Sequence, residues 1–224
     1  MKRKKSKKRT KRSSNIALLL FFIVLAFVLF DQFKQLNIKE TAVSLLPNTV
    51  SRDVQNYTPK LEKELKEVNL EEYTLVLAAI MQQESKGKGG DPMQASESAG
   101  LPPNTIQDPE ESIKQGVKHF QKALTYGNQK NVDFPAVIQA YNMGIGYIDF
   151  VAEQGGKHSE EIAKEFSLKQ AEKNPEVYDC GGDTNNFRYP YCYGDFTYTT
   201  KVTKNIETLT ASNSDRSKEI KSVW

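Results

Sequence analysis

The sequence predicts a mainly α domain that follows one N-terminal membrane-spanning helix. Its 224 residues suit one ordinary domain with short extensions. An unbroken apolar run near the N-terminus has the length of a bilayer-spanning helix. Further along, apolar residues recur at helical spacing behind residues that cap helices. We therefore divide the chain into a basic tail (1–15), a transmembrane signal anchor (16–33), a stalk (34–56), a folded domain (57–210) and a polar tail (211–224).

The N-terminus has the layout of a signal anchor. Residues 1–15 hold nine Lys or Arg residues and no acidic residue, and fifteen apolar residues follow from Ile16 to Phe30. Weakly polar flanks extend this segment to about twenty residues, enough to cross a bilayer. A cleavable signal peptide begins in the same way but ends in small residues, whereas Leu29-Phe30-Asp31 stands here. We favour the uncleaved anchor over the cleavable peptide.

The basic residues of the N-terminal tail predict which side of the membrane each part of the chain occupies. The net charge is +3, but without the nine basic residues of the tail the chain has 22 basic against 28 acidic residues, or −6. Positive charge stays cytoplasmic, so we expect the remainder to face outward from the cell membrane. A nucleic-acid-binding arm ahead of a buried helix is the alternative, and it is weak because the apolar run has no polar face. An acidic body also argues against a nucleic-acid partner.

Few residues are suited to metal or thiol chemistry. The chain has two His and two Cys and contains no HExxH or paired CxxC motif, so we expect no bound metal and no cofactor. Cys180 and Cys192 lie twelve positions apart in a Gly-, Asn- and Tyr-rich stretch. Outside the cell such a pair favours a disulfide, which in the chain-entropy model stabilises by about 3 kcal/mol. Two unrelated thiols remain the alternative, because spacing alone does not fix geometry.

The first two predicted helices follow the stalk. Thr58-Pro59 is a good N-cap and first-turn pair, and apolar residues then repeat at helical spacing. Asn69 is the predicted cap of a second, strongly apolar helix that runs to about Met81 and is stopped by the glycines of the next loop. Residues 86–107 form a long loop with room for a small β hairpin.

The remaining helices have weaker signals. Asp108-Pro109 with Glu111 resembles a capping box and begins a helix whose buried stripe is Ile113, Val117, Phe120 and Leu124. Shorter helices are predicted over 134–141 and 147–154, and Ser167 is the predicted cap of another. An aromatic, turn-rich stretch, 176–196, precedes a last helix over 198–209.

Glu84 is the first candidate for chemistry. It ends the apolar second helix, where the negative end of the helix dipole disfavours a charged carboxylate. Apolar neighbours act in the same direction. A carboxyl group that stays neutral near pH 7 can donate a proton, as the general acid of a glycosidase does. Without further context, a solvated Glu at a helix end would be the better interpretation.

Three ordered motifs supply that context. They are Gln83-Glu84-Ser85, Asp91-Pro92-Met93-Gln94 and Ala140-Tyr141-Asn142-Met143-Gly144. Together they resemble the Glu-Ser, Met-Gln and Ala-Tyr-Asn-x-Gly motifs of the goose-type lysozyme and lytic transglycosylase superfamily. A closer resemblance is to the bacterial lysozyme-like family of Gram-positive wall hydrolases, which includes the muramidase domains of conjugative elements and pneumococcal vaccine antigen A type proteins. The resemblance covers about 57–210.

The resemblance implies a lysozyme-like fold and a role for each matching residue. Glu84 would protonate the glycosidic oxygen, and Tyr198 matches the Tyr that orients the acid in transglycosylases. The implied substrate-binding set is Ser85, Gln94, Ser96, Tyr141, Asn142 and Tyr198. Other interpretations stay open for some of them. Ser85 and Gln94 are also suited to capping loop backbone, Tyr141 to the core, and Asn142 to ending a helix.

A second carboxylate would decide the reaction. Inverting hydrolysis needs a base that holds water, with the two carboxyl groups roughly 6.5–9.5 Å apart. Asp91 is our first candidate because it follows Gly89-Gly90 in the loop after the acid, and Glu97 is the second. A loop acid that makes a local turn is the alternative. Lytic transglycosylases need no such base, but Asp91-Pro92 departs from the Gly-Leu of their pattern.

We therefore expect a membrane-anchored glycoside hydrolase that cleaves peptidoglycan between N-acetylmuramic acid and N-acetylglucosamine. Its expected partners are glycan strands, the cytoplasmic membrane and other wall-hydrolase or conjugation-machinery proteins. A lytic transglycosylase and a non-catalytic wall-binding module are the rival hypotheses. A cysteine peptidase that uses His119 or His158 is disfavoured, because neither Cys has a nucleophile context. His119 itself is predicted to be solvated or capping.

Overall fold

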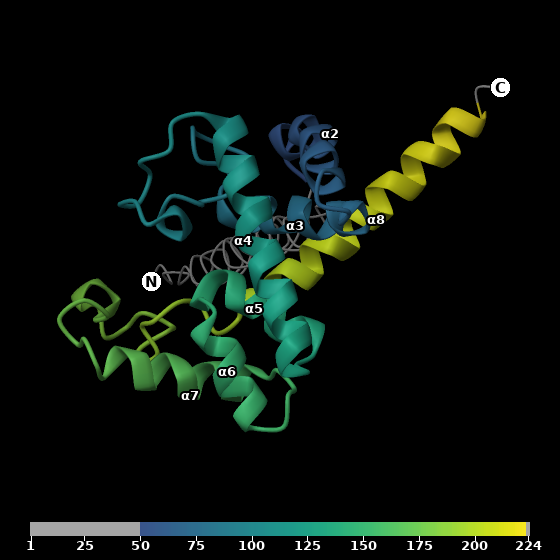
Figure 1. Ribbon diagram of the computed structural model, residues 1–224. Helices are drawn as coiled ribbons and strands as arrows, with labels where there is room; N and C mark the ends of the chain where they lie inside the picture. Colours follow the sequence, from purple (N-terminus) through teal and green to yellow (C-terminus); the bar gives the residue numbers. More distant parts are fainter. Residues whose placement is uncertain (1–49, 223–224) are drawn as a thin grey trace, which may run out of the picture. The chain divides into compact units, whose positions relative to one another are not determined.

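The computed structural model describes residues 50–222, and it describes the side chains only as far as residue 211. The predicted anchor, the basic tail and most of the stalk lie outside these residues. Within them the prediction of a mainly α domain is confirmed, and the possible hairpin is wrong because no strand occurs (Figure 1). The elements are α2 (Arg52–Lys66), η1 (Glu71–Tyr73), α3 (Thr74–Glu84), η2 (Glu97–Ala99), α4 (Pro109–Lys130), α5 (Phe134–Met143), α6 (Gly146–Glu153), α7 (Glu160–Ala171), η3 (Cys180–Gly182) and α8 (Tyr198–Ser222).

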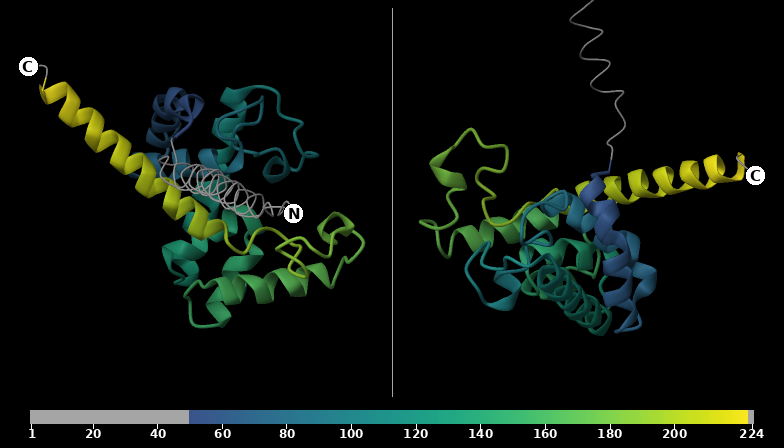
Figure 2. Two further views of the ribbon diagram at one scale, coloured as in Figure 1. Left: turned by 180° about the vertical axis from the view of Figure 1, so that it is seen from behind. Right: turned by 90° about the horizontal axis from the view of Figure 1, so that it is seen from above.

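Helix α3 is the centre of the domain. Five consecutive residues, 77–81, are fully buried, so the helix is apolar on every side. It packs against α2 and α8, and the long helix α4 packs against α2, α5 and α6. Helix α8, yellow in Figure 2, packs against α3, and its C-terminal part extends beyond the other helices. Burial of α3 fixes the position of Glu84 at its last turn.

The first helix begins earlier than predicted. Ser51, not Thr58, caps α2, and its hydroxyl accepts a bond from the Asp53 amide. Pro59 therefore lies inside the helix, where a proline costs about 3 kcal/mol. Val54 is fully buried, and its burial favours extending the helix toward the N-terminus. The folded domain thus includes the end of the predicted stalk.

Two predicted caps are wrong for a related reason. Asn69 has a left-handed backbone with φ of 56° and lies in the turn after α2, and the 3₁₀ turn η1 separates it from α3. Ser167 lies inside α7, which begins instead behind the Ser159 cap. The Ser167 hydroxyl is buried and bonds both the amide and the carbonyl of Tyr193. Both residue types are common helix caps, but here Asn69 lies in a turn and Ser167 makes a tertiary hydrogen bond.

The start of α4 lies where the sequence predicts it. Asp108 caps α4 by accepting from the Glu110 amide, and Pro109 occupies the first turn, as predicted. The predicted stripe of α4 is buried. Helix α8 is longer than predicted, because it continues through the polar tail to Ser222. Among the described residues, no helix combines the length and the apolar character needed to span a membrane.

Two loops shape one face of the domain. The first, 85–107, passes close to α2: a side chain at Gly87 would meet the backbone of Val54 at 2.8 Å, and Gly87 has φ of +76°. Only glycine meets both conditions. The second loop joins α7 to α8 and is closed by the disulfide between Cys180 and Cys192, whose Cα atoms are 5.0 Å apart.

Candidate active site

Glu84 faces a cavity between these two loops. The cavity has a volume of about 520 Å³, and its lining includes Glu84, Gln94, Glu97, His119, Tyr141 and Asn142. Helices α3, α4 and α5 and both loops contribute to it. The end of the buried helix α3 thus places the Glu84 side chain at the cavity wall. Such a concave site with one acid and several polar groups is typical of a ligand site.

The environment of Glu84 raises the pKa of its carboxyl group into the neutral range. Burial raises the pKa of Glu84 to about 7, although the hydrogen bond from Tyr198 acts in the opposite direction. The negative charges of Asp91 and Asp195 contribute to the same rise. A carboxyl group with this pKa is divided between its acid and base forms near pH 7. It can therefore donate a proton to a bound substrate under physiological conditions.

Tyr198 holds the acid in place. Its hydroxyl donates to Oε1 of Glu84 at 2.5 Å, across 114 positions of sequence. Tyr198 is 2% exposed and begins α8. Burial and the nearby charge of Glu84 raise the pKa of Tyr198 well above its usual value, so the phenol remains a donor.

Replacing Tyr198 by Phe is expected to move the pH dependence of activity upward. Its hydrogen bond stabilises the charged form of Glu84, so its loss raises the pKa of Glu84 above 7. The basic limb of the kcat/KM profile should therefore shift to higher pH. The maximal rate should also fall by about tenfold, because the acid is no longer oriented. A pH–rate profile on solubilised substrate measures both effects, and an unmoved basic limb would contradict this role.

A two-amide clamp, formed by Gln139 and Asn142 of α5, positions the segment that carries Tyr198. Asn142 Oδ1 accepts from the Asp195 amide at 2.7 Å, and Gln139 Nε2 donates to the Asp195 carbonyl at 2.7 Å. Gln139 Oε1 also accepts from the Thr199 amide and hydroxyl. Gln139 is fully buried, so these bonds satisfy an amide that could not remain unpaired there. The clamp fixes the start of α8 relative to the cavity.

Tyr141, between the two clamp residues, holds the opposite loop. Its hydroxyl donates to the Met93 carbonyl at 3.2 Å, and the residue is 8% exposed. His119 packs edge-on against it, with ring centroids 4.7 Å apart, and its Nε2 lies 3.1 Å from the Tyr141 carbonyl oxygen. Burial is the main reason that the pKa of His119 is lowered. His119 is half-buried and lines the cavity, so it is not a solvated surface residue. Its contact with a backbone carbonyl in the last turn of α5 agrees with the predicted capping role.

Asp91 anchors the loop after the acid. It is 4% exposed, and its two oxygens accept four bonds, from the Ser96 and Ser112 hydroxyls and the Ala95 and Ser96 amides. Burial alone would raise the pKa of Asp91, but these bonds together hold it below its usual value. Asp91 is thus a charged group with all its lone pairs engaged. Its predicted role as a base stays a prediction, set against this structural role.

The other predicted residues divide into two groups. Gln94, Tyr141 and Asn142 line the cavity. These three also bond protein groups, and the Gln94 amide donates to the Asp91 carbonyl, as a residue that caps loop backbone would. Ser85 and Ser96 are not part of the cavity lining and bond protein groups: Ser85 donates to the Pro92 carbonyl at 2.7 Å, and Ser96 is 1% exposed. Their role as sugar contacts stays a prediction that this packing does not favour. In the described part of the chain, no cluster of three His, Cys, Asp or Glu residues is arranged to hold a metal ion.

Comparison with known proteins identifies the family. A sequence model described as lysozyme-like matches residues 51–206, which is nearly the whole described domain. The chain belongs to the lysozyme-like family. The Bacillus subtilis membrane protein YocA is 49% identical over 192 residues, which is 86% of this chain and 83% of YocA. Pneumococcal vaccine antigen A of Streptococcus pneumoniae is 32% identical over 168 residues, covering 75% of this chain and 77% of that protein.

Two further relatives are longer proteins. The bifunctional muramidase/DL-endopeptidase CwlT of Bacillus subtilis is 40% identical over 124 residues, which is 55% of this chain but only 37% of CwlT. The crystal structure of a Staphylococcus aureus protein, described as similar to lipoprotein of the NLP/P60 family, superposes with a TM-score of 0.60 at 40% identity. That match covers 70% of this chain and 54% of the other. This chain therefore corresponds to one part of each.

Proposed function

We propose that the protein is a membrane-anchored N-acetylmuramidase with Glu84 as its general acid. The observation that carries the proposal is a carboxyl group with a pKa of about 7, bonded by Tyr198, at the wall of a cavity large enough for a sugar unit. Its substrate would be the bond between N-acetylmuramic acid and N-acetylglucosamine in peptidoglycan. The muramidase named in CwlT and the lysozyme-like family both support a cell-wall hydrolase.

In this proposal, Glu84 gives its proton to the glycosidic oxygen as the bond breaks. Tyr198 remains bonded to the carboxylate that forms and limits the pKa rise caused by burial. Gln94 and Asn142 present polar side chains at the cavity, where they are suited to bind sugar hydroxyl and N-acetyl groups. Membrane anchoring is supported by the apolar run at 16–30 and by the description of YocA as a membrane protein.

One observation favours a lytic transglycosylase as the second candidate. Asp91 has four donors on its carboxylate, and Asp195 forms an ion pair with Lys201 at 2.5 Å. Neither carboxylate has the free, solvated oxygen that a water-activating base requires. Glu97 is the other acid that lines the cavity in the described chain, and it is exposed. A transglycosylase would need no base, because the muramyl hydroxyl attacks instead.

The ends of the products distinguish these reactions. Purified peptidoglycan is digested with the full-length protein and the fragments are analysed by mass spectrometry. Reducing muramic acid ends are the expected result and support hydrolysis, whereas 1,6-anhydromuramic ends support the transglycosylase. Reducing N-acetylglucosamine ends would contradict both assignments. Binding to peptidoglycan without release of any fragment would support a non-catalytic wall-binding module.

A further inference from the structure

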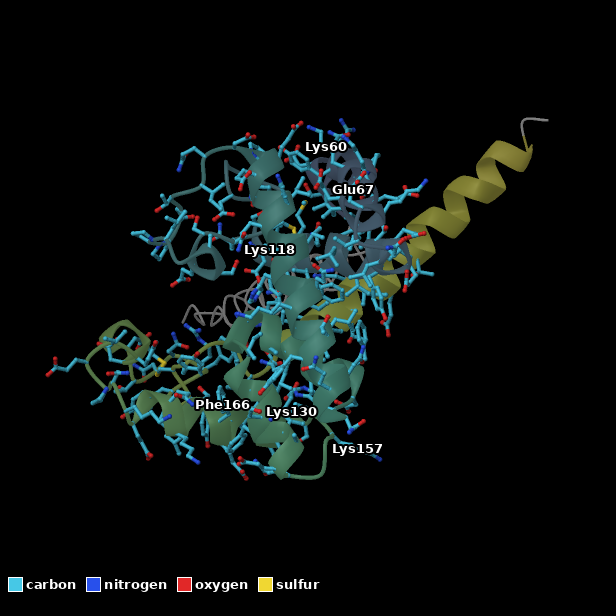
Figure 3. The ribbon with its side chains drawn as sticks, in the orientation of Figure 1. Lys60, Glu67, Lys118, Lys130, Lys157 and Phe166 are labelled. Carbon is cyan, nitrogen blue, oxygen red and sulfur yellow. A yellow bond between two sulfur atoms is a disulfide. The ribbon has the colours of Figure 1, made fainter. Side chains whose placement is uncertain are left out.

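A second hollow lies on α4 beside the Glu84 cavity. It has a volume of about 510 Å³, and its lining includes Lys118, Gln121, Lys122, Tyr126, Gln129 and Ile145. Lys118 is visible on α4 in Figure 3. The α4 residues recur at helical spacing along one face, and Ile145 precedes α6. We call this hollow the lysine groove.

The residues that line the lysine groove and those that line the Glu84 cavity are consecutive in the chain at two points. Lys118 and Ile145 line the groove, while their chain neighbours His119 and Gly144 line the cavity. The positive charge of Lys122 also contributes to lowering the pKa of His119, after the larger effect of burial, so its ammonium group lies within electrostatic range of the cavity wall. A ligand in the cavity could therefore extend a branch into the groove.

The charges in the lysine groove lack protein partners. Lys60, Lys130 and Lys201 form ion pairs within the described residues, whereas Lys118 and Lys122 form none there. Both side chains are exposed, and they stand beside the half-buried Tyr126 and Ile145. Their ammonium groups are therefore available to an anionic ligand. This combination fits a ligand that has both carboxylates and small apolar groups.

We propose that the lysine groove binds the peptide stem of peptidoglycan while the glycan strand occupies the Glu84 cavity. The stem is a short peptide on the muramic acid lactyl group, and it carries free carboxylates and alanine methyl groups. Lys118 and Lys122 bind the carboxylates, Gln121 and Gln129 bond the peptide backbone, and Ile145 contacts the methyl groups. This inference rests on the proposed function, because it assumes that peptidoglycan enters the cavity.

A charge-removing double variant tests the groove. Lys118→Gln with Lys122→Gln is compared with the control pair Lys66→Gln and Lys157→Gln, which makes the same charge change at exposed sites outside the groove. Substrates are peptidoglycan freed of attached phosphate polymers, with its stems intact or removed by an amidase. The groove variant should raise KM about fivefold on the stem-bearing substrate and leave it unchanged on the stripped glycan. An equal effect on both substrates, or no effect on either, would overturn the proposal.

A binding measurement separates this proposal from the proposed function. The full-length Glu84→Gln protein, with and without the two lysine changes, is titrated with a soluble disaccharide-tetrapeptide and with the matching disaccharide. Weaker binding of the tetrapeptide ligand alone in the lysine variant supports the groove even if the wild-type protein cleaves neither substrate. Equal affinities for the tetrapeptide ligand in both proteins would refute the groove while leaving the cleavage assignment intact.

Discussion

Glu84→Gln is expected to lower the rate of peptidoglycan cleavage by about a thousandfold, since the variant cannot donate the proton. Gln has nearly the size of Glu, and its carbonyl oxygen can still accept the bond from Tyr198. Binding of glycan should therefore persist while turnover is lost. Release of reducing ends from purified peptidoglycan measures the rate. Glu67→Gln, at an exposed position labelled in Figure 3, is the matched control and should keep full activity.

The same substitution is expected to stabilise the fold at alkaline pH. The pKa of Glu84 rises from 4.5 to about 7 on folding, so the folded state binds the proton more tightly than the unfolded state. Stability is therefore lost as pH rises from about 4.5 to 7 and stays lower above that range. Ionisation of Glu84 lowers the free energy of unfolding by at most about 3 kcal/mol. Denaturant unfolding should show Glu84→Gln as the more stable protein at pH 8, with the difference vanishing near pH 4.

Asp91→Asn is expected to destabilise the protein by about 2–4 kcal/mol. The amide would place an NH₂ group where Asp91 now accepts bonds from hydroxyl and backbone donors. Because the four bonds hold the pKa of Asp91 low, its contribution is present above a pH of about 4 and is lost as pH falls through the folded-state pKa. Unfolding in urea at pH 7 measures the loss, which should shrink in acid.

Ser112→Ala separates the structural role of Asp91 from a catalytic one. Its hydroxyl donates to Asp91 at 2.6 Å and accepts from the Met93 amide, so its loss weakens the loop without removing a carboxylate. We expect it to lower both stability and activity in the same direction as Asp91→Asn. If instead Asp91→Asn abolished hydrolysis at unchanged stability while Ser112→Ala remained active, Asp91 would be the base and not the anchor.

The sequence predicts those parts of the fold that depend on neighbours in the chain. The cap of α4 at Asp108 and the buried stripe of that helix are local patterns, and the structure contains both. The position of Glu84 at the end of α3 also follows from where the apolar run stops. Thr58 and Ser167 are mispredicted, because burial of Val54 and bonding to Tyr193 are tertiary effects that no local pattern reveals.

The candidate site shows the same division. The resemblance to known motifs selects Glu84 and Tyr198, and the structure places their side chains in contact. The sequence resemblance alone does not distinguish a side chain that contacts substrate from one that bonds other protein groups. Gln139 carries no signal of its own, although it bonds a segment 56 positions away. The contacts of His119 with Tyr141 likewise depend on two helices that meet only in the folded chain.

The 114 positions between Glu84 and Tyr198 have a consequence for the timing of activity. A ribosome that adds about 5–20 residues per second needs roughly ten seconds to make that interval. During that time α3 exists without the phenol that orients its acid and without the clamped segment ahead of α8. The nascent chain is therefore incomplete as a catalyst until its last helix docks, and a chain truncated before that helix would never acquire the oriented acid.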